Sequence, residues 1–523
     1  MLHSENRQGG AQSHRPLTFI ATFLFLIATT ACGQGQPLSQ EEIAAQQRSY
    51  IFDASAQDAR RQLGHLLSVP SGEGLDVDTL VRNYYAGGEP WVWMNGDRLL
   101  PQADSLVTYL RQQVPSLGYN PEVFLIDSLA KDLVALDTLL TDTTNRPSAL
   151  MARLELNLSK ALVRYAAGQH FGFTNPHRIF NRIDRGGSEP GGYRRIFDID
   201  LRRPDSAFVA RSLAQVNAGT LLSYVNSLEP ADSAYRVLRD SLLADTTGAR
   251  RDLLLCNMER LRWRPELTAD SSDRHIFVNI AAQQLWAVGP DSIQQMRICC
   301  GAPGTKTPLL HSKIHHVEVN PEWGIPVSII RNEVSAHAGD SSYFARHGYY
   351  VTDGRTGQRV NPGSLSRDQM RTGRYSVRQY SGAGNSLGRL IFRFKNQFSV
   401  YLHDTNNRSA FSRDRRTISH GCVRVQHPFD LTRFVLPGAD DQALDQIRLS
   451  IDYRPETEWG KEYKRQHPGA IRLVNNKDVA PQVPVFIEYY TLLPNPKTGK
   501  MEKWGDPYSF DQPLLKAIKP FMP

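Results

Sequence analysis

The chain has 523 residues, of which 40% are apolar and 22% are charged. These proportions are ordinary for a globular protein, and the length is enough for two or three domains with their own cores. The net charge of +8 comes from scattered basic residues, a pattern that favours a solvated surface over a nucleic-acid partner. Five cysteines are too few for a disulfide framework in so long a chain.

The N-terminal segment has the layout of a secretory signal. Basic residues precede an apolar run at residues 19–28, and small residues then lead into Cys32. The run is too short for a membrane-spanning helix, which needs about 20 apolar residues. We therefore predict a signal peptide over residues 1–31 and export to the periplasm or cell envelope, which also argues against a nucleic-acid partner.

Cys32 directly follows these small residues, as in a bacterial lipoprotein processing site. This resemblance implies lipidation of Cys32 and a membrane anchor. Thr29 departs from the pattern, because an aliphatic residue is usual there. Plain cleaved export and an uncleaved anchor are the alternatives.

The region from residue 32 to 265 has helical periodicity, and we predict a helical scaffold domain. Asn120 can cap a helix that begins at Pro121, since proline is tolerated at the first position. Apolar residues between 151 and 165 form one stripe at helical spacing, which predicts a core-facing helix. Two further helical stretches and a short connector follow at residues 206–227, 231–244 and 245–251.

Strand patterns replace the helical ones after residue 265. Residues 275–280 and 284–288 are predicted strands before a Gly-Pro-Asp turn, and alternation over 390–394 predicts another. A second alternation over 398–402 turns His403 away from the core, so we expect this histidine on the open side of the sheet. Residues 428–436 are predicted to form a short helix beneath it.

Cys422 lies in the segment Ser419-His420-Gly421-Cys422, and His403 is nineteen residues upstream. A cysteine is a poor nucleophile at neutral pH unless a base takes its proton and nearby donors stabilise an oxyanion. The segment offers a thiol, a histidine and a glycine-led turn. The alternative is a buried cysteine beside an unrelated histidine.

The stretch from Asn279 to Leu436 resembles the catalytic domain of bacterial L,D-transpeptidases, which cross-link peptidoglycan through a cysteine. Their signature is a histidine, roughly 14 to 17 residues, then Ser/Thr-His-Gly-Cys and Asn or Arg. Here fifteen residues separate His403 from Ser419, and Arg424 takes the last position. Flanking motifs extend the resemblance at residues 301–308, 320–326, 384–388 and 401–405, and segments 257–263 and 484–491 resemble the large multidomain subfamily.

This resemblance implies an α+β multidomain fold. The mainly α-helical scaffold would cover residues 32–265. The β-rich catalytic domain, a β-sandwich-like mixed sheet with short helices, would cover residues 266–455. Residues 333–380, polar and loop-rich, are expected to form a lid, and residues 456–523 a C-terminal extension whose strand completes the active-site region.

Two features depart from the family pattern. The small peptidoglycan-binding module of the large subfamily is missing between the last scaffold helix and residue 256, so glycan affinity would have to come from the scaffold or the catalytic cleft. Asp404 stands where smaller members often have glycine.

The resemblance also implies roles for individual residues. Cys422 would be the nucleophile, His403 the general base and acid, Gly421 a backbone donor of the oxyanion hole, and Asp404 the source of a carbonyl that orients His403. Substrate binding would fall to the remaining residues of the motif and its flanks, namely Arg424, Ser419, His420, Tyr401 and Asn385. His420 could equally have a structural role in shaping the turn.

The implied reaction starts with a thiolate–imidazolium pair that attacks a tetrapeptide stem at its third residue, a diamino acid. D-Alanine leaves, and an amine acceptor resolves the thioester. The partners are therefore peptidoglycan stem peptides, and no cofactor is expected. A non-catalytic peptidoglycan-binding lipoprotein and a cysteine peptidase or carboxypeptidase acting on the stems are the alternative functions.

The remaining cysteines and a group of histidines are expected to be structural. Cys299 and Cys300 are adjacent in a strand and should point to opposite faces, and Cys256 should be buried. Adjacent histidines at 315 and 316, with His311 nearby, would likewise face opposite ways. No ligand set surrounds them, so we predict no metal site.

Overall fold

The computed structural model describes residues 39, 42, 57–69, 75–95, 98–138, 147–244, 248–268 and 274–522. The predicted signal peptide and Cys32 lie outside the described residues. Within those ranges, no helix combines the length and the apolar character needed to cross a membrane.

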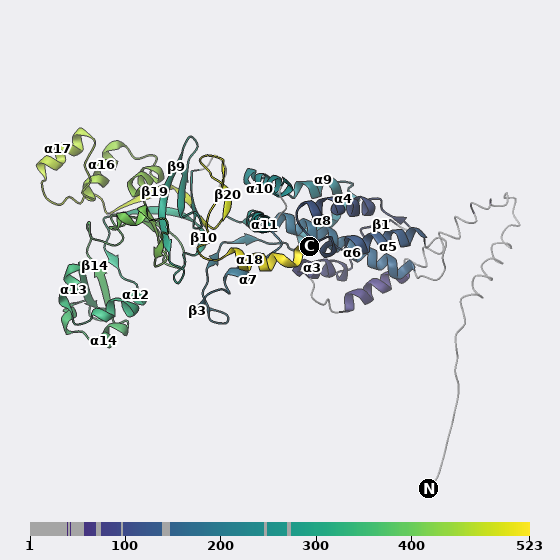
Figure 1. Ribbon diagram of the computed structural model, residues 1–523, viewed down its shortest axis with the longest axis horizontal. Coiled ribbons are helices and arrows are strands. Elements are labelled where there is room, and N and C mark those ends of the chain that lie inside the picture. Colours follow the sequence, from purple (N-terminus) through teal and green to yellow (C-terminus); the bar gives the residue numbers. More distant parts are fainter. Residues whose placement is uncertain are drawn as a thin grey trace, which may run out of the picture.

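The first part of the chain forms a group of helices at one end of an elongated molecule (Figure 1). The helices are α3 Asp76–Ala86, α4 Gln102–Ser116, α5 Ile126–Thr138, α6 Pro147–Phe171, α7 Pro176–Phe180, α8 Ser206–Asn217, α9 Leu221–Ser227, α10 Ser233–Ala244 and α11 Gly248–Arg262. Short strands accompany them at β1 Met94–Asn95, β2 Arg98–Leu99, β3 Arg185–Glu189, β4 Phe197–Asp198, β5 Leu201–Arg202 and β6 Arg264–Pro265.

Helix α6 is the centre of this group. It packs against α3, α5 and α8 and is buried on almost every side rather than along the single predicted stripe. Its polar Glu155 is 0% exposed and accepts hydrogen bonds from the backbone amides of Val92 and Trp93 and from the Tyr85 hydroxyl. A buried carboxyl group with several donors ties the preceding loop to the helix.

Several predicted helix boundaries are corrected by the structure. Asn120 caps as predicted, since its side chain accepts from the Glu122 amide at 3.0 Å, but the capped element is a 3-10 helix, Pro121–Phe124. The single helix predicted over 206–227 is two helices, α8 and α9, with Gly219 at φ +71° between them. Helix α11 begins at Gly248, inside the predicted connector.

The second part of the chain is built on a ten-stranded mixed sheet. Its further strands are β7 His275–Asn279, β8 Gln284–Val288, β9 Ile293–Gly301, β10 Leu309–Val319, β15 Leu390–Phe394, β16 Leu402–His403, β17 Thr417–Ser419, β18 Val423–Val425 and β19 Asn476–Glu488. The strand order is β15-β16-β18-β9-β8-β7-β19-β10-β4. Because β10 also pairs with β15, the sheet closes on itself around an apolar core. The predicted α+β fold class, with a helical part and a β-rich part, is confirmed.

The predicted lid is a folded subdomain with a core of its own. It contains β11 Trp323–Gly324, α12 Val327–Asn332, η2 Val334–His337, α13 Ser341–Arg346, β12 Tyr349–Asp353, β13 Arg359–Val360, η3 Pro362–Ser364, α14 Arg367–Arg371 and β14 Tyr375–Gln379. Buried side chains such as Ile330, Phe344 and Met370 form its core. We call residues 323–379 the lid subdomain; it projects from the main sheet in Figure 1.

The last part of the chain returns to the helical domain. It contains η4 Arg408–Ser412, α15 Pro428–Val435, α16 Asp441–Ser450, α17 Glu458–Gln466, β20 Leu492–Pro494, β21 Met501–Lys503, α18 Asp511–Ile518 and η5 Lys519–Phe521. Strand β19 lies inside the sheet, between β7 and β10. Helix α18 packs on α7 and α11, as the yellow helix of Figure 1 shows, and the Phe521 carbonyl accepts from the Asn120 amide at 2.7 Å. The domain boundaries given by the sequence stay predictions.

Candidate active site

Two adjacent parallel strands bring Cys422 and His403 to one face of the sheet. In the register of β16 and β18, Leu402 pairs with Val423 and His403 with Arg424. Paired residues share a face and neighbours along a strand alternate. The apolar residues Leu402 and Val423, both 0% exposed, therefore point into the core, and Cys422, which precedes Val423, shares the opposite face with His403.

The chain before His403 is not the regular strand that the alternation predicts. Ser399 has φ +54°, and the Asn396 side chain accepts from the amides of Phe398 and Val400 and donates to the Val400 carbonyl. This side chain replaces strand pairing over the predicted segment, so β16 is reduced to Leu402–His403. The Ser399 carbonyl lies 3.8 Å from the Cys422 sulfur.

His403 is 4% exposed, so the expectation that it lies on an open side is wrong. Burial lowers the pKa of His403 to about 4, and the positive charge of Arg424 acts in the same direction. The nearby backbone of Asp404 and Leu387 opposes the shift without overcoming it. Within the described ranges Nδ1 has no hydrogen-bond partner.

Cys422 is partly exposed. Burial raises the pKa of its thiol to about 11, while the Tyr401 backbone and the charges of Arg393 and Arg424 act in the opposite direction. Between the two pKa values the pair is a neutral thiol and a neutral imidazole. These protonation states differ from the thiolate–imidazolium pair that the family resemblance implies.

The turn from Ser419 to Cys422 is held by hydrogen bonds within the motif. The Ser419 hydroxyl donates to the Cys422 carbonyl at 2.6 Å and accepts from the Gly421 amide at 3.1 Å. Gly421 has φ +127°, a backbone conformation that favours glycine. The Gly421 amide, which was expected to face an oxyanion, is therefore engaged within the turn. The Cys422 amide donates no hydrogen bond to any described residue.

Arg424 and Tyr401 lie beside the pair. The Nε atom of Arg424 is buried and has no hydrogen-bond partner in the described part of the chain, and its charge reaches both His403 and Cys422. The Tyr401 ring lies 6.1 Å from the His403 ring, with the Arg393 guanidinium 4.3 Å above it. The substrate-binding role of these two side chains stays a prediction.

His420 and Asn385 have contacts within the protein. The Nε2 atom of His420 lies 2.7 Å from a carboxylate oxygen of Glu333 in the lid subdomain, and both side chains are about half exposed. Asn385 is 1% exposed and donates to the Tyr380 carbonyl while it accepts from the Leu387 amide. Their roles in substrate binding stay predictions.

Asp404 is buried, and its carboxylate accepts a hydrogen bond from the loop that precedes β15. One carboxylate oxygen accepts from the Arg389 amide at 2.8 Å, and the other from Arg408 at 3.1 Å. Gly388, at φ +64°, leaves space for this side chain, because a Cβ there would lie 2.4 Å from the Asp404 Cγ. Asp404, which stands where smaller family members often have glycine, therefore fits because residue 388 is a glycine.

Four residues near the site were missed by sequence reasoning as contributors. Arg393 and Glu333 contact it from β15 and the lid subdomain. Thr307 lies in a motif that was recognised without a role, and its hydroxyl donates to the Gly421 carbonyl at 2.7 Å. Tyr508 contacts Thr307 from the far end of the chain, a distance that no local pattern encodes.

The three other cysteines lie as predicted, but the prediction for the two adjacent histidines is wrong. The Nδ1 atoms of His315 and His316 lie 2.8 Å apart, because a β-bulge between Ile314 and His316 interrupts the alternation of faces. Cys256, Cys299 and Cys300 are buried, and the last two contribute to different clusters on opposite faces of β9. His311 lies 2.7 Å from a Glu488 carboxylate oxygen. In the described part of the chain, no group of three or more His, Cys, Asp or Glu residues is arranged to hold a metal ion.

A cavity of about 590 Å³ lies in the helical domain, between α3, α6, α7 and the C-terminal helix. Its walls include Arg164, Arg178 and Arg203. None of the predicted site residues lines it, so the cavity is separate from the thiol chemistry.

The fold and the site together define a class of protein. A closed mixed sheet is joined to a helical domain, and it holds a histidine on one strand and a cysteine directly before the adjacent parallel strand. Residues 273–445 match the family described as the L,D-transpeptidase catalytic domain, and residues 78–242 match the scaffold domain. The chain therefore carries an L,D-transpeptidase catalytic domain behind a scaffold domain, and the resemblance to this family is confirmed.

Individual relatives agree with these matches. A Haemophilus influenzae protein provisionally named an L,D-transpeptidase is 31% identical over 245 residues, which are 46% of this chain and 49% of the relative. The chain thus spans about half the length of that relative.

Two solved structures are also similar. An L,D-transpeptidase from Mycobacterium smegmatis has 11% identity and a TM-score of 0.19, with coverage of 43% of this chain and 71% of that one. L,D-transpeptidase 3 from Mycobacterium tuberculosis has 10% identity and a TM-score of 0.19, with coverage of 43% and 73%.

Proposed function

We propose that this protein is an exported L,D-transpeptidase that acts on peptidoglycan stem peptides through a thioester on Cys422. The observation that carries the proposal is the shared face of His403, in β16, and Cys422, directly before the adjacent parallel strand β18. Both residues lie inside the segment matched to the catalytic domain. Export and lipidation at Cys32 rest on the N-terminal sequence alone.

Acylation begins from the neutral pair. The Cys422 sulfur attacks the carbonyl carbon of the third stem residue, a diamino acid, while the thiol proton passes to His403. The carbonyl electrons move to oxygen, where the Cys422 amide can donate a hydrogen bond. His403 then returns the proton to the amine of D-alanine as the carbon–nitrogen bond breaks, which leaves a thioester.

Transfer reverses these roles. The amine of a neighbouring stem attacks the thioester carbon and loses a proton to His403. A new amide bond forms, and the thiol of Cys422 takes its proton back. Burial of the imidazole keeps it neutral at neutral pH, which is the form that a general base needs in both steps.

Arg424 is proposed to bind a carboxylate of the stem. A guanidinium binds carboxylates in a planar geometry, and the Nε atom of Arg424 has no partner among the described residues. Tyr401 and the motif residues Ser419 and His420 complete the proposed substrate contacts, and Glu333 of the lid subdomain contacts His420.

The test is turnover of purified tetrapeptide muropeptides, followed by mass spectrometry of the products. We expect the wild-type protein to form cross-linked dimers and to release D-alanine, and Cys422→Ala to form neither. Cys256→Ala is the matched control, because that thiol is buried in α11 and its loss should leave turnover in place. Cross-link formation by Cys422→Ala would sink the mechanism, and wall binding without any turnover by the wild-type protein would favour a non-catalytic binding protein.

A further inference from the structure

The peptide unit between Gly421 and Cys422 contains two polar groups, a carbonyl and an N–H, with different roles. A trans peptide is planar, so its carbonyl and its N–H point in opposite directions. Here the carbonyl belongs to Gly421 and the N–H to Cys422. A group that fixes the orientation of the Gly421 carbonyl therefore also fixes the orientation of the Cys422 amide. No described residue accepts a hydrogen bond from this amide.

Thr307 holds that carbonyl in a defined way. Its side chain is 0% exposed, and its hydroxyl donates to the Gly421 carbonyl at 2.7 Å. The same hydroxyl accepts from the Gly301 amide at 2.8 Å. A hydroxyl has one hydrogen to donate. Because the Gly301 amide can only donate to the Thr307 hydroxyl, the hydroxyl hydrogen is available to the Gly421 carbonyl.

Tyr508 holds the backbone around Thr307 through two hydrogen bonds. Its hydroxyl donates to the Gly301 carbonyl at 2.7 Å and accepts from the Thr307 amide at 3.0 Å. The side chain is 3% exposed, so water does not compete for these bonds. One tyrosine thus clamps both ends of the loop from Gly301 to Thr307.

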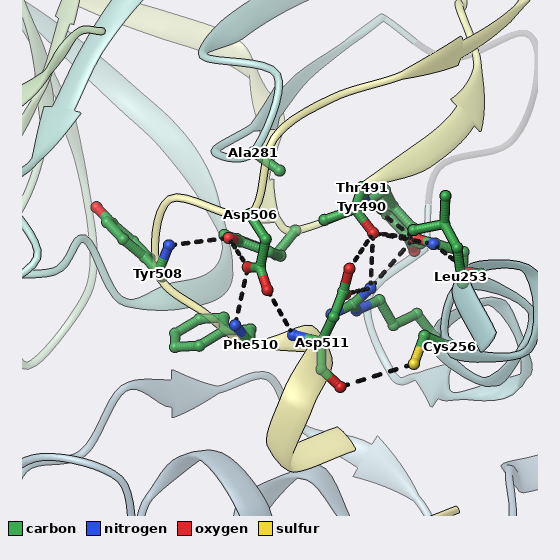
Figure 2. A network of polar contacts seen from close by, with 12 residues as sticks. Leu253, Cys256, Ala281, Tyr490, Thr491, Asp506, Tyr508, Phe510 and Asp511 are labelled. Carbon is green, nitrogen blue, oxygen red and sulfur yellow. Dashed lines mark hydrogen bonds and ion pairs between the residues drawn. The ribbon is translucent and has the colours of Figure 1, made fainter. Parts of the chain in front are cut away.

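Tyr508 is in turn held by the C-terminal segment that docks on the helical domain. Its amide donates to the Tyr489 hydroxyl at 3.0 Å, and that hydroxyl bonds to Asp506. Figure 2 shows Asp506 bonded to the amides of Phe510 and Asp511 at the start of α18. A chain of buried and partly buried contacts therefore connects the docked helix to the turn that carries the nucleophile.

We propose that Thr307 is a positioning residue that aims the Cys422 amide at the oxygen of the scissile carbonyl, and that Tyr508 holds Thr307 in place. This inference rests on the proposed acyl-transfer function. During acylation the sulfur–carbon bond forms, the carbonyl electrons move to oxygen and the thiol proton passes to His403. The aimed amide stabilises the negative oxygen of that step.

The test compares two reactions of the same thiol. Acylation by a carbapenem passes through a tetrahedral oxyanion, whereas alkylation by iodoacetamide displaces iodide and does not. We expect Thr307→Val to slow acylation roughly 10- to 100-fold, less than the approximately 10²- to 10³-fold cost of deleting an oxyanion donor. Alkylation at the same pH should stay within about twofold of the wild-type rate, because the thiol is unchanged.

Two further variants keep the test decisive. Thr307→Ser retains the hydroxyl and should restore acylation, and Tyr508→Phe should slow acylation selectively even if Thr307→Val fails to fold. Equal slowing of both reactions, or unchanged acylation in both folded variants, would overturn the inference. Wild-type protein that is not acylated at all would instead contradict the proposed function.

Discussion

Burial sets the protonation of the two reactive groups. It raises the pKa of the Cys422 thiol to about 11 and lowers the pKa of the His403 imidazole to about 4. In both cases the charged form loses hydration that the site does not replace. Proton transfer is then part of the attack on the substrate rather than a step completed beforehand.

The pH dependence of alkylation follows from these two shifts. Iodoacetamide reacts with the thiolate, whose fraction rises as pH approaches a thiol pKa of about 11. We expect the alkylation rate of Cys422 in the purified protein to rise steadily from about pH 6 to about pH 10, with Cys422→Ala as the background control. A rate that levels off below neutral pH would show a preformed ion pair and contradict this account.

The pairing of Cys422 with His403 could be predicted from sequence, and the environment of the pair could not. The motif spacing fits two neighbouring strands, and the alternation correctly turned Leu402 into the core. The local turn around Asn396, with Ser399 at φ +54°, depends on one side chain bonding to nearby backbone. No periodic pattern reports such a turn, and for this reason the burial of His403 was missed.

At the scale of elements, the loop before β15 is built around one close contact. Gly388 at φ +64° faces the Asp404 carboxyl group, and Asp404 follows His403 directly. Any side chain at residue 388 would push against the residue beside the proposed base.

We expect Gly388→Ala to lower the free energy of unfolding by about 1–3 kcal/mol, because it adds a strained φ and a steric conflict. Carbapenem acylation should slow with it. Gly384→Ala is the matched control, since a Cβ there meets nothing within 4 Å, and its effect should stay within about 0.5 kcal/mol. Urea unfolding measures both variants, and equal stability of the two would contradict the role given to this contact.

The lid subdomain shows where composition misleads. Its sequence is polar enough to suggest loops, yet buried residues such as Ile330, Phe344 and Met370 form a separate core. These apolar residues are distributed over short helices and strands, so no single window of the sequence reveals them. The short helix predicted at 428–436 was found as α15, because its pattern is local.

At the scale of the whole molecule, the C-terminal segment joins the two parts. Arg260 of α11 has a side chain that is 2% exposed, and its guanidinium lies 2.7 Å from Asp511 at the start of α18. Thr491 also donates to Asp511, at 2.8 Å. The ion pair joins residues about 250 positions apart in the sequence, and no pattern in the sequence indicated it.

We expect Asp511→Ala to destabilise the protein by about 2–3 kcal/mol, because it leaves the buried Arg260 charge without its carboxylate. The estimate lies below the range for a fully buried pair because the Asp511 side chain is 23% exposed. Gln512→Ala, at an exposed position of the same helix, should have little effect. Thermal unfolding measures both variants. Equal unfolding midpoints would show that this ion pair does not support the docking of α18.

The central claim is that Cys422 is the acyl-accepting nucleophile, and intact mass after incubation with a carbapenem tests it most directly. The account predicts one covalent adduct per chain, located on the peptide that contains Cys422, and no adduct in Cys422→Ala. The buried thiols of Cys256, Cys299 and Cys300 should stay unmodified. An unmodified wild-type protein, or an adduct on another cysteine, would contradict the claim.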